Sequence, residues 1–216
     1  MRNRKDSKSG RIIRIAGRLP VFTLDDLASI ESGKSYLRIL LSRYVKSGAA
    51  SRLKKGLYVT KEYLDRIEKS GRADAYAEFL VAVLYTPSYL SLEYVMHQHG
   101  LITESPVVVT AVARKKTASF STPFGVYRYH TIKQALFTGF TSKRNGDYLI
   151  FRASRAKALF DFLYFRKSHL ANAKAIEELR INLDALQESD KQELARYIEL
   201  EGSARMKNIF TTLWKN

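Results

Sequence analysis

The stretch ASRLKKGLYV, residues 50–59, has the pattern of a short β-hairpin with a strongly basic tip. Apolar residues flank the turn Lys54-Lys55-Gly56, where glycine suits a tight turn because it tolerates a positive φ angle. Three cations lie close together here, since Arg52 joins the two lysines, and they repel one another. The hairpin therefore either contacts a polyanion or uses Lys to protect a strand edge from aggregation.

The residues before this hairpin predict three helices. Residues 8–18 place Ile among basic residues with the spacing of an amphipathic helix. A short second helix is expected after Thr23, whose hydroxyl suits a helix N-cap. The third covers residues 34–46, with Leu side chains at helical spacing, and Gly48 ends it. Three helices and then a hairpin is the order of a winged helix-turn-helix, whose hairpin tip lies beside the DNA backbone.

In such a domain the third helix enters the major groove, and its first residues face the bases. We therefore expect DNA contacts from Lys34, Ser35, Tyr36 and Arg38, with Arg43 deeper along the helix. An Arg side chain can bind guanine bidentately, whereas Ser and Tyr more often contact phosphate. The alternative for Tyr36 is a packed position under the hairpin. The hairpin would hold the DNA backbone through Arg52, Lys54 and Lys55.

The charge balance also indicates a polyanionic partner. The 216 residues contain 37 Lys or Arg and 21 Asp or Glu, a formal charge of +16. Residues 1–66 alone hold 16 basic and 6 acidic side chains, a net charge of +10. This asymmetry favours nucleic acid, and next an anionic membrane, at the N-terminal end. The N-terminal end of the chain forms either an arm that binds the minor groove of DNA or a solubilising tail. Its cations are Arg2, Arg4, Lys5 and Lys8.

Several classes of site are excluded or disfavoured. The chain has no cysteine, which excludes disulfides, iron–sulfur clusters and thiolate zinc sites. It has no apolar run near the roughly 20 residues of a membrane span, so we expect a soluble cytoplasmic protein. His97 and His99 stand two residues apart, unlike the i, i+4 pair of a zinc helix, and no third ligand is near. We expect no metal and no cofactor.

The remainder predicts a second domain, so the fold class is α+β, with a winged helix-turn-helix at 1–70 and a mixed helical and antiparallel-sheet domain at 71–216. Helices are expected over 73–85 and 88–100. The β-branched and aromatic runs predict strands, and the Asn145-Gly146 pair predicts a hairpin turn. The expected strands are 107–112, 118–121, 126–131 and 148–151, and the rest is helical.

One motif invites a catalytic interpretation. Ser154-Arg155-Ala156-Lys157 matches the S-x-x-K of penicillin-recognising acyl enzymes, but the companion S-D-N and K-T-G motifs are missing. Ser154 is better interpreted as a helix N-cap. Lys157 and Asp161 are four residues apart and can pair across one helical turn. With no paired nucleophile and base in the sequence, we expect no catalytic residue and no enzyme.

The chain resembles the AbiEi-like antitoxins, regulators of type IV toxin–antitoxin and abortive-infection systems, over nearly all of residues 15–165. The N-terminal motifs are F-T-L-D-D-L, R-I-L-L-S-R-Y-V-K-S-G and S-R-L-K-K-G-L-Y. The C-terminal motifs are P-S-Y-L-S-L-E-Y, H-G-L-I, P-F-G with Tyr127 and Tyr129, and A-K-A-L-F-D. The family usually has Pro-Glu where Arg155-Ala156 stand here.

The resemblance implies a repressor and antitoxin. The N-terminal domain would bind inverted repeats in double-stranded operator DNA as a monomer or weak dimer, and the C-terminal domain would counter a neighbouring nucleotidyltransferase toxin without a stable complex. Two alternatives stay open: an RNA- or nucleotide-handling protein, and a ligand-responsive repressor without a toxin. The resemblance assigns no role to residues 166–216.

Overall fold

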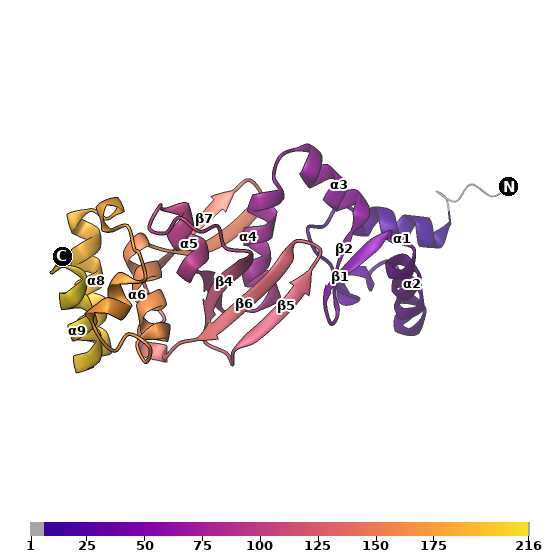
Figure 1. The fold of residues 1–216 in the computed structure, drawn as a ribbon. Coiled ribbons are helices and arrows are strands. Elements are labelled where there is room, and N and C mark those ends of the chain that lie inside the picture. The colour runs from indigo at the N-terminus through magenta and orange to yellow at the C-terminus, as the bar shows by residue number, and fades with distance from the viewer. Residues whose placement is uncertain (1–6, 216) are drawn as a thin grey trace. The chain divides into compact units, whose positions relative to one another are not determined.

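The structure is a computed structural model that describes residues 7–215. Within them the chain forms two compact units. The N-terminal unit contains the described chain up to Ala77 together with Phe120–Phe124, and the C-terminal unit contains Glu78–Ser119 and the chain from Gly125 onward. Figure 1 follows the chain through both units. The N-terminal unit thus takes in a few residues beyond 1–70 and one short segment from much later in the sequence.

The N-terminal unit is built from helices and one hairpin. The helix expected over 8–18 is α1, and the helix expected over 34–46 has those bounds. The short helix after Thr23 is a single 3-10 turn, and the Asp26 carboxylate accepts hydrogen bonds from the Thr23 N–H and hydroxyl, each at 2.7 Å. The elements are α1 (Lys8–Ala16), η2 (Asp25–Leu27), α2 (Lys34–Lys46), β1 (Ala50–Lys54), β2 (Leu57–Thr60) and α3 (Lys61–Lys69).

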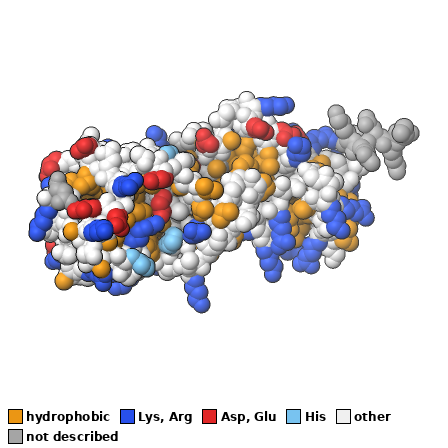
Figure 2. Space-filling view, in the orientation of Figure 1, with side chains coloured by type: hydrophobic (Ala, Val, Ile, Leu, Met, Phe, Trp, Pro, Cys, Tyr) orange, Lys and Arg blue, Asp and Glu red, His pale blue; other side chains and the backbone are white. Residues whose placement is uncertain are grey.

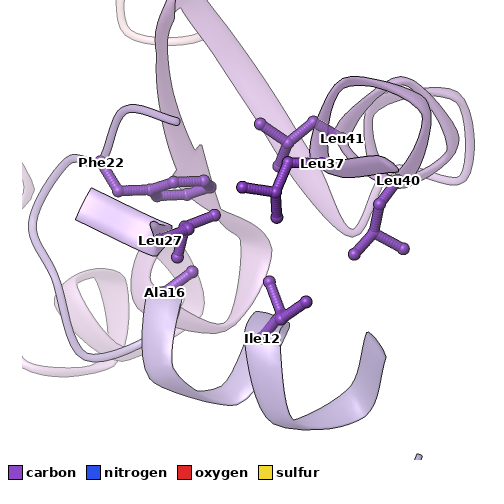
Figure 3. Close-up of a cluster of buried hydrophobic side chains, with 7 residues drawn as sticks. All are labelled: Ile12, Ala16, Phe22, Leu27, Leu37, Leu40 and Leu41. Carbon is purple, nitrogen blue, oxygen red and sulfur yellow. The ribbon is translucent and has the colours of Figure 1, made fainter. Parts of the chain in front are cut away.

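A small apolar core holds the first three helices of this unit together (Figure 3). Ile12 and Leu37, from α1 and α2, are fully buried and point toward one another. Burying an aliphatic side chain of this size contributes about 1.5–3 kcal/mol, so the cluster fixes which face of α2 stays outside. Its members are Ile12, Ala16, Phe22, Leu27, Leu37, Leu40 and Leu41.

The hairpin is tied to the helices through one residue. β1 and β2 pair antiparallel, and Gly56 at their turn has a φ of 80°. Phe22 pairs with Tyr58 of β2, since each backbone N–H donates to the other carbonyl at 2.9 Å. The ring of Phe22 lies in the helical core, so this residue connects the sheet hydrogen bonds to the packing of α1 and α2.

A six-stranded sheet has the strand order β5-β6-β4-β3-β8-β7, and its strands belong to the C-terminal unit except for Phe120–Thr122 of β5. Its antiparallel pairs include β3·β4 and β7·β8, but β4·β6 and β3·β8 are parallel. The expectation of an antiparallel sheet is therefore wrong. β3 and β4 each have one parallel neighbour, β8 and β6, and parallel strands are joined by longer connections than a hairpin turn. The strands are β3 (Ser88–Leu90), β4 (Val108–Ala113), β5 (Ala118–Thr122), β6 (Gly125–Thr131), β7 (Phe140–Asn145) and β8 (Tyr148–Ala153).

One element differs in type from its sequence prediction. Residues 88–90 were expected to open a helix, but they form strand β3 in the middle of the sheet. Their side chains are buried, and their backbone pairs with β4 and β8, so tertiary pairing overrides the local helix signal. The helix α5 (Leu92–Gln98) begins after Ser91 and ends at His99.

α4 (Ala73–Leu84) begins in the N-terminal unit and continues into the C-terminal unit from Glu78 onward. The other helices of the C-terminal unit are α5 and those that follow the sheet. α6 is the most buried of them, and it contacts α5, α8 and α9 (Figure 1). No helix in residues 7–215 combines the length and apolar character that a membrane crossing needs. The later elements are α6 (Arg155–Arg166), α7 (Ala173–Glu177), α8 (Glu188–Glu201), α9 (Ala204–Leu213) and the 3-10 turns η3 (Gln134–Leu136) and η4 (Leu183–Ala185).

Candidate nucleic-acid interface

The outer face of α2 carries most of the residues expected to contact DNA. The buried residues Leu37, Leu40 and Leu41 hold the inner face in the core. The hydroxyl of Tyr44 donates to the Ser9 carbonyl at 2.6 Å and fixes α2 to α1. The other positions of the helix are exposed to solvent, and they include the five expected residues Lys34, Ser35, Tyr36, Arg38 and Arg43.

The first turn of α2 shows two specific contacts. Lys34 Nζ lies 3.1 Å from Asp25 Oδ1, and both side chains are largely exposed, so this pair adds little stability and leaves Lys34 accessible. The Tyr36 side chain is 40% exposed, and Lys8 Nζ lies 5.7 Å from its ring centroid. Tyr36 therefore does not pack under the hairpin, and part of its side chain is exposed to solvent.

The basic residues of the hairpin lie where the pairing of the two strands becomes irregular. The regular register ends between Arg52 and Lys54, where one strand has an extra residue. Arg52 Nε donates to the Lys54 carbonyl at 3.3 Å, which holds the Arg52 side chain toward the turn. Lys55 is exposed at the tip, and Lys54 is half-buried. Figure 2 shows Lys and Arg side chains gathered over this part of the N-terminal unit.

Sequence reasoning missed Ile39, which lies at the centre of the exposed face of α2. Its side chain is 56% exposed, although isoleucine is among the residue types most often buried. On a helix its surface neighbours are the residues three and four positions away, here Ser35, Tyr36, Ser42 and Arg43. The signal was present in the sequence, because Ile39 falls outside the apolar stripe of Leu37, Leu40 and Leu41.

The start of α1 neutralises one of the few acids near this face. Lys8 forms an ion pair with Glu31, and the Gly33 N–H donates to the same carboxylate at 2.7 Å. The hydrogen bond from Lys8, together with that from Gly33, lowers the pKa of Glu31 below its ordinary value. The remaining cations of the expected N-terminal arm, Arg2, Arg4 and Lys5, lie outside the described residues.

The second group of residues singled out in the sequence forms a buried network in the C-terminal unit. Lys157 Nζ lies 2.6 Å from Asp161 Oδ1 and donates to the Leu136 carbonyl at 2.8 Å. Asp161 Oδ2 accepts hydrogen bonds from Tyr89 at 3.0 Å and from Ser91 at 2.7 Å. Burial raises the pKa of Asp161 and lowers that of Lys157, and the predicted i, i+4 pair is confirmed.

The S-x-x-K motif has a structural explanation. The Ser154 hydroxyl accepts from the Lys157 N–H at 3.0 Å, so Ser154 caps α6 as expected. The same hydroxyl donates to Glu193 Oε1 at 2.7 Å, and the Tyr197 hydroxyl donates to that oxygen at 2.6 Å. Ser154 thus joins α6 to α8, while the Lys157 ammonium points into the network around Asp161.

Residues 7–215 contain no group of three or more His, Asp or Glu side chains arranged to hold a metal ion. His99 is the C-cap of α5, and burial, reinforced by the nearby charges of Arg155 and Arg152, lowers its pKa.

Comparisons with known proteins add no identification, because no protein-family model and no curated protein matches this chain.

Proposed function

We propose that the N-terminal unit is a winged helix-turn-helix that binds operator DNA, and that the protein is a transcriptional repressor. α2 would be the recognition helix, and the β1–β2 hairpin would be the wing. The observation that carries the proposal is the outer face of α2, where cations and hydroxyls are exposed while the leucines of the same helix are buried.

The chemistry of this face suits a DNA duplex. Arg38 would bind the N7 and O6 atoms of guanine, since a guanidinium group can donate two hydrogen bonds to that edge. Lys34, Ser35 and Tyr36 would hold phosphates or base edges at the start of the helix. Arg52 and Lys55 would contact the backbone at the wing, where their mutual repulsion is offset because phosphate contacts release counterions. The order of elements and the Phe22–Tyr58 pairing support this placement.

We further propose that the C-terminal unit acts as the antitoxin of a type IV system against a nucleotidyltransferase toxin. This part of the proposal rests on the resemblance of the motifs around Tyr89, Tyr127 and Asp161 to AbiEi-like antitoxins. The buried positions of these three residues make them part of the framework of the unit rather than a contact surface. The antitoxin surface is therefore to be sought among exposed residues.

Binding to the DNA upstream of the gene tests the repressor proposal. The full chain should shift a duplex containing inverted repeats at concentrations that leave a scrambled duplex of equal length unbound. Competition with unlabelled duplexes at about 0.15 M salt, where non-specific phosphate contacts weaken, measures the ratio of the two affinities. Equal affinity for the two duplexes would exclude a sequence-specific repressor.

A co-expression assay tests the antitoxin proposal separately. Cells that express the nucleotidyltransferase toxin proposed to be encoded next to this gene should grow only when this protein is also produced from a promoter that it does not control. A variant with Arg38→Ala and Lys55→Ala should still protect the cells, because the proposed protective unit is C-terminal. Loss of protection in this variant would contradict the proposal that the N-terminal unit binds DNA and the C-terminal unit alone counters the toxin.

A further inference from the structure

The C-terminal unit contains a second gathering of cations, and these surround one cavity of about 610 Å³. Lys143 and Arg144 come from β7, Arg152 comes from β8, and Arg155 comes from the first turn of α6. In the β7·β8 ladder, Lys143 pairs with Ile150 and Thr141 pairs with Arg152, so Lys143 and Arg152 are diagonal neighbours on one face of the hairpin. The topology therefore concentrates positive charge at one site.

Two carboxylates orient the arginines of this cavity without cancelling its charge. Arg152 NH2 lies 2.5 Å from Glu78 Oε2, and Arg155 NH2 lies 3.0 Å from Asp190 Oδ2. Arg155 also donates from NH1 to the Ala185 carbonyl at 3.0 Å. Each guanidinium has five N–H donors, so donors remain for a ligand after these contacts. Both arginines are thus held in place in advance of binding.

The other two cations have no acidic partner. Lys143 and Arg144 are exposed on β7, and neither forms an ion pair with any residue in the described range. Four cations and two carboxylates leave the lining with a net charge of +2. The start of α6 adds to this field, because the positive end of a helix dipole lies at its N-terminus. The cavity therefore favours a ligand with at least two negative charges.

We propose that this cavity binds the polyphosphate group of a nucleotide. Arginine forks and a lysine are the side chains that proteins use for phosphate oxygens. The volume lies within the range of small-molecule sites, about 300–1,000 Å³, and leaves room for more than the phosphates. Ile150 supplies an apolar wall, and the amide of Asn145 can donate to and accept from a base edge. The polyphosphate belongs either to a free nucleoside triphosphate or to the 5′ end of an RNA.

Calorimetry with the full chain tests this site. Inorganic tripolyphosphate, ATP and UTP should each bind, whereas adenosine should not, because the proposed recognition is of phosphate. The double variant Lys143→Ala/Arg144→Ala should weaken binding by roughly tenfold or more, since a hydrogen bond to a charged group contributes about 1.5–3 kcal/mol. Both residues are exposed, so the variant should keep the thermal unfolding midpoint of the parent protein.

Two control variants separate this site from general attraction to a basic protein. Arg114→Ala/Lys116→Ala removes the same two charges from exposed positions after β4 and should leave the affinity unchanged. Arg38→Ala/Lys55→Ala removes cations from the proposed DNA interface and should also leave it unchanged. Equal weakening by any of these controls, absence of binding to tripolyphosphate and triphosphates, or binding of adenosine as tight as that of ATP would overturn the proposal.

A short RNA distinguishes the two sources of the polyphosphate. A 5′-triphosphate oligonucleotide is compared with the same oligonucleotide that ends in a 5′-hydroxyl. Tighter binding of the triphosphate form than of ATP, lost in Lys143→Ala/Arg144→Ala, identifies an RNA end as the ligand. Equal binding of the two RNA forms, together with binding of ATP that depends on the same residues, identifies a free nucleotide.

Discussion

Lys157 and Asp161 pair at 2.6 Å inside the C-terminal unit, and neither side chain has any solvent exposure. Each charge has further partners, because Lys157 also donates to a backbone carbonyl and Asp161 also accepts from Tyr89 and Ser91. Such a network stays in place only while all of its members are present, because an unpaired buried charge is costly.

Replacing Asp161 with Ala should therefore lower the free energy of unfolding by about 3–5 kcal/mol, because it leaves the Lys157 ammonium buried without its counter-ion. Chemical denaturation followed by the fluorescence of Trp214 measures this. Glu199→Ala is the matched control, since Glu199 pairs with Lys207 at 2.7 Å on the surface and should cost no more than about 1 kcal/mol. An equal decrease in the free energy of unfolding for the two variants would contradict the claim that burial makes the Lys157–Asp161 pair costly to break.

Gly139 should tolerate no side chain. Its φ is +75°, and a Cβ atom would lie 2.1 Å from the Tyr197 hydroxyl and 3.0 Å from Lys157 Cγ. Gly139→Ala should lower the free energy of unfolding by about 1–2 kcal/mol from left-handed backbone strain, with about 1–3 kcal/mol more from overpacking. Gly100→Ala measures the backbone strain alone, because Gly100 has a φ of +70° and open space around it. If the two variants unfold at the same denaturant concentration, the clash is relieved by movement of Tyr197.

Arg38 and Lys55 should affect DNA binding in different ways. Arg38→Ala should cost about 1–3 kcal/mol on the operator and relax the preference at one base pair, because a bidentate contact to guanine is lost. Lys55→Ala should weaken binding to all duplexes and reduce the slope of log affinity against log salt by about one unit. Titrations at several salt concentrations measure both effects. Lys69→Ala, on α3, should change neither quantity, and a changed salt slope in that variant would contradict the proposed face.

Ile39 should recognise the methyl group of a thymine, since an exposed aliphatic side chain amid polar ones on a recognition helix suits that contact. Replacing the contacted thymine with deoxyuridine removes one methyl group and should weaken binding by about 0.8 kcal/mol, roughly fourfold. Ile39→Ala should bind the two duplexes equally. If no single replacement of thymine with deoxyuridine changes the affinity of the parent protein, the contact between Ile39 and a thymine methyl group is wrong. That result would not contradict DNA binding by α2.

The stability of the C-terminal unit should fall in mild acid, partly through His130. Burial lowers the pKa of His130 below its ordinary value of 6.5, reinforced by Arg128 and Arg166 and opposed by Glu93. Below about pH 6.5 the unfolded chain takes up a proton that the folded chain resists, so the free energy of unfolding decreases as the pH falls. His130→Phe keeps the ring contact with Phe165 and removes this loss. Denaturation at pH 7 and pH 5 should show a smaller decrease for the variant, and parallel decreases would refute the role of His130.

The sequence by itself determined the local features of this protein. Hydrophobic period and turn glycines placed α1, α2 and the β1–β2 hairpin, because helix and turn preferences act over a few neighbouring residues. The i, i+4 spacing of Lys157 and Asp161 and the cap at Ser154 were predictable for the same reason. The exposure of Ile39 was also implicit in the leucine stripe of α2.

Only the tertiary structure decided what depends on residues far apart in the chain. Tyr89 and Leu90 became strand β3 because β4 and β8 offer backbone partners on both sides, and no local pattern contains those partners. The parallel pairs of the sheet, the closure of Tyr89 and Ser91 onto Asp161, and the assembly of Lys143, Arg152 and Arg155 around one cavity have the same origin. These three features depend on contacts between residues that are distant in the chain. Buried backbone and charged groups need hydrogen-bond or ionic partners, and only the tertiary fold supplies them.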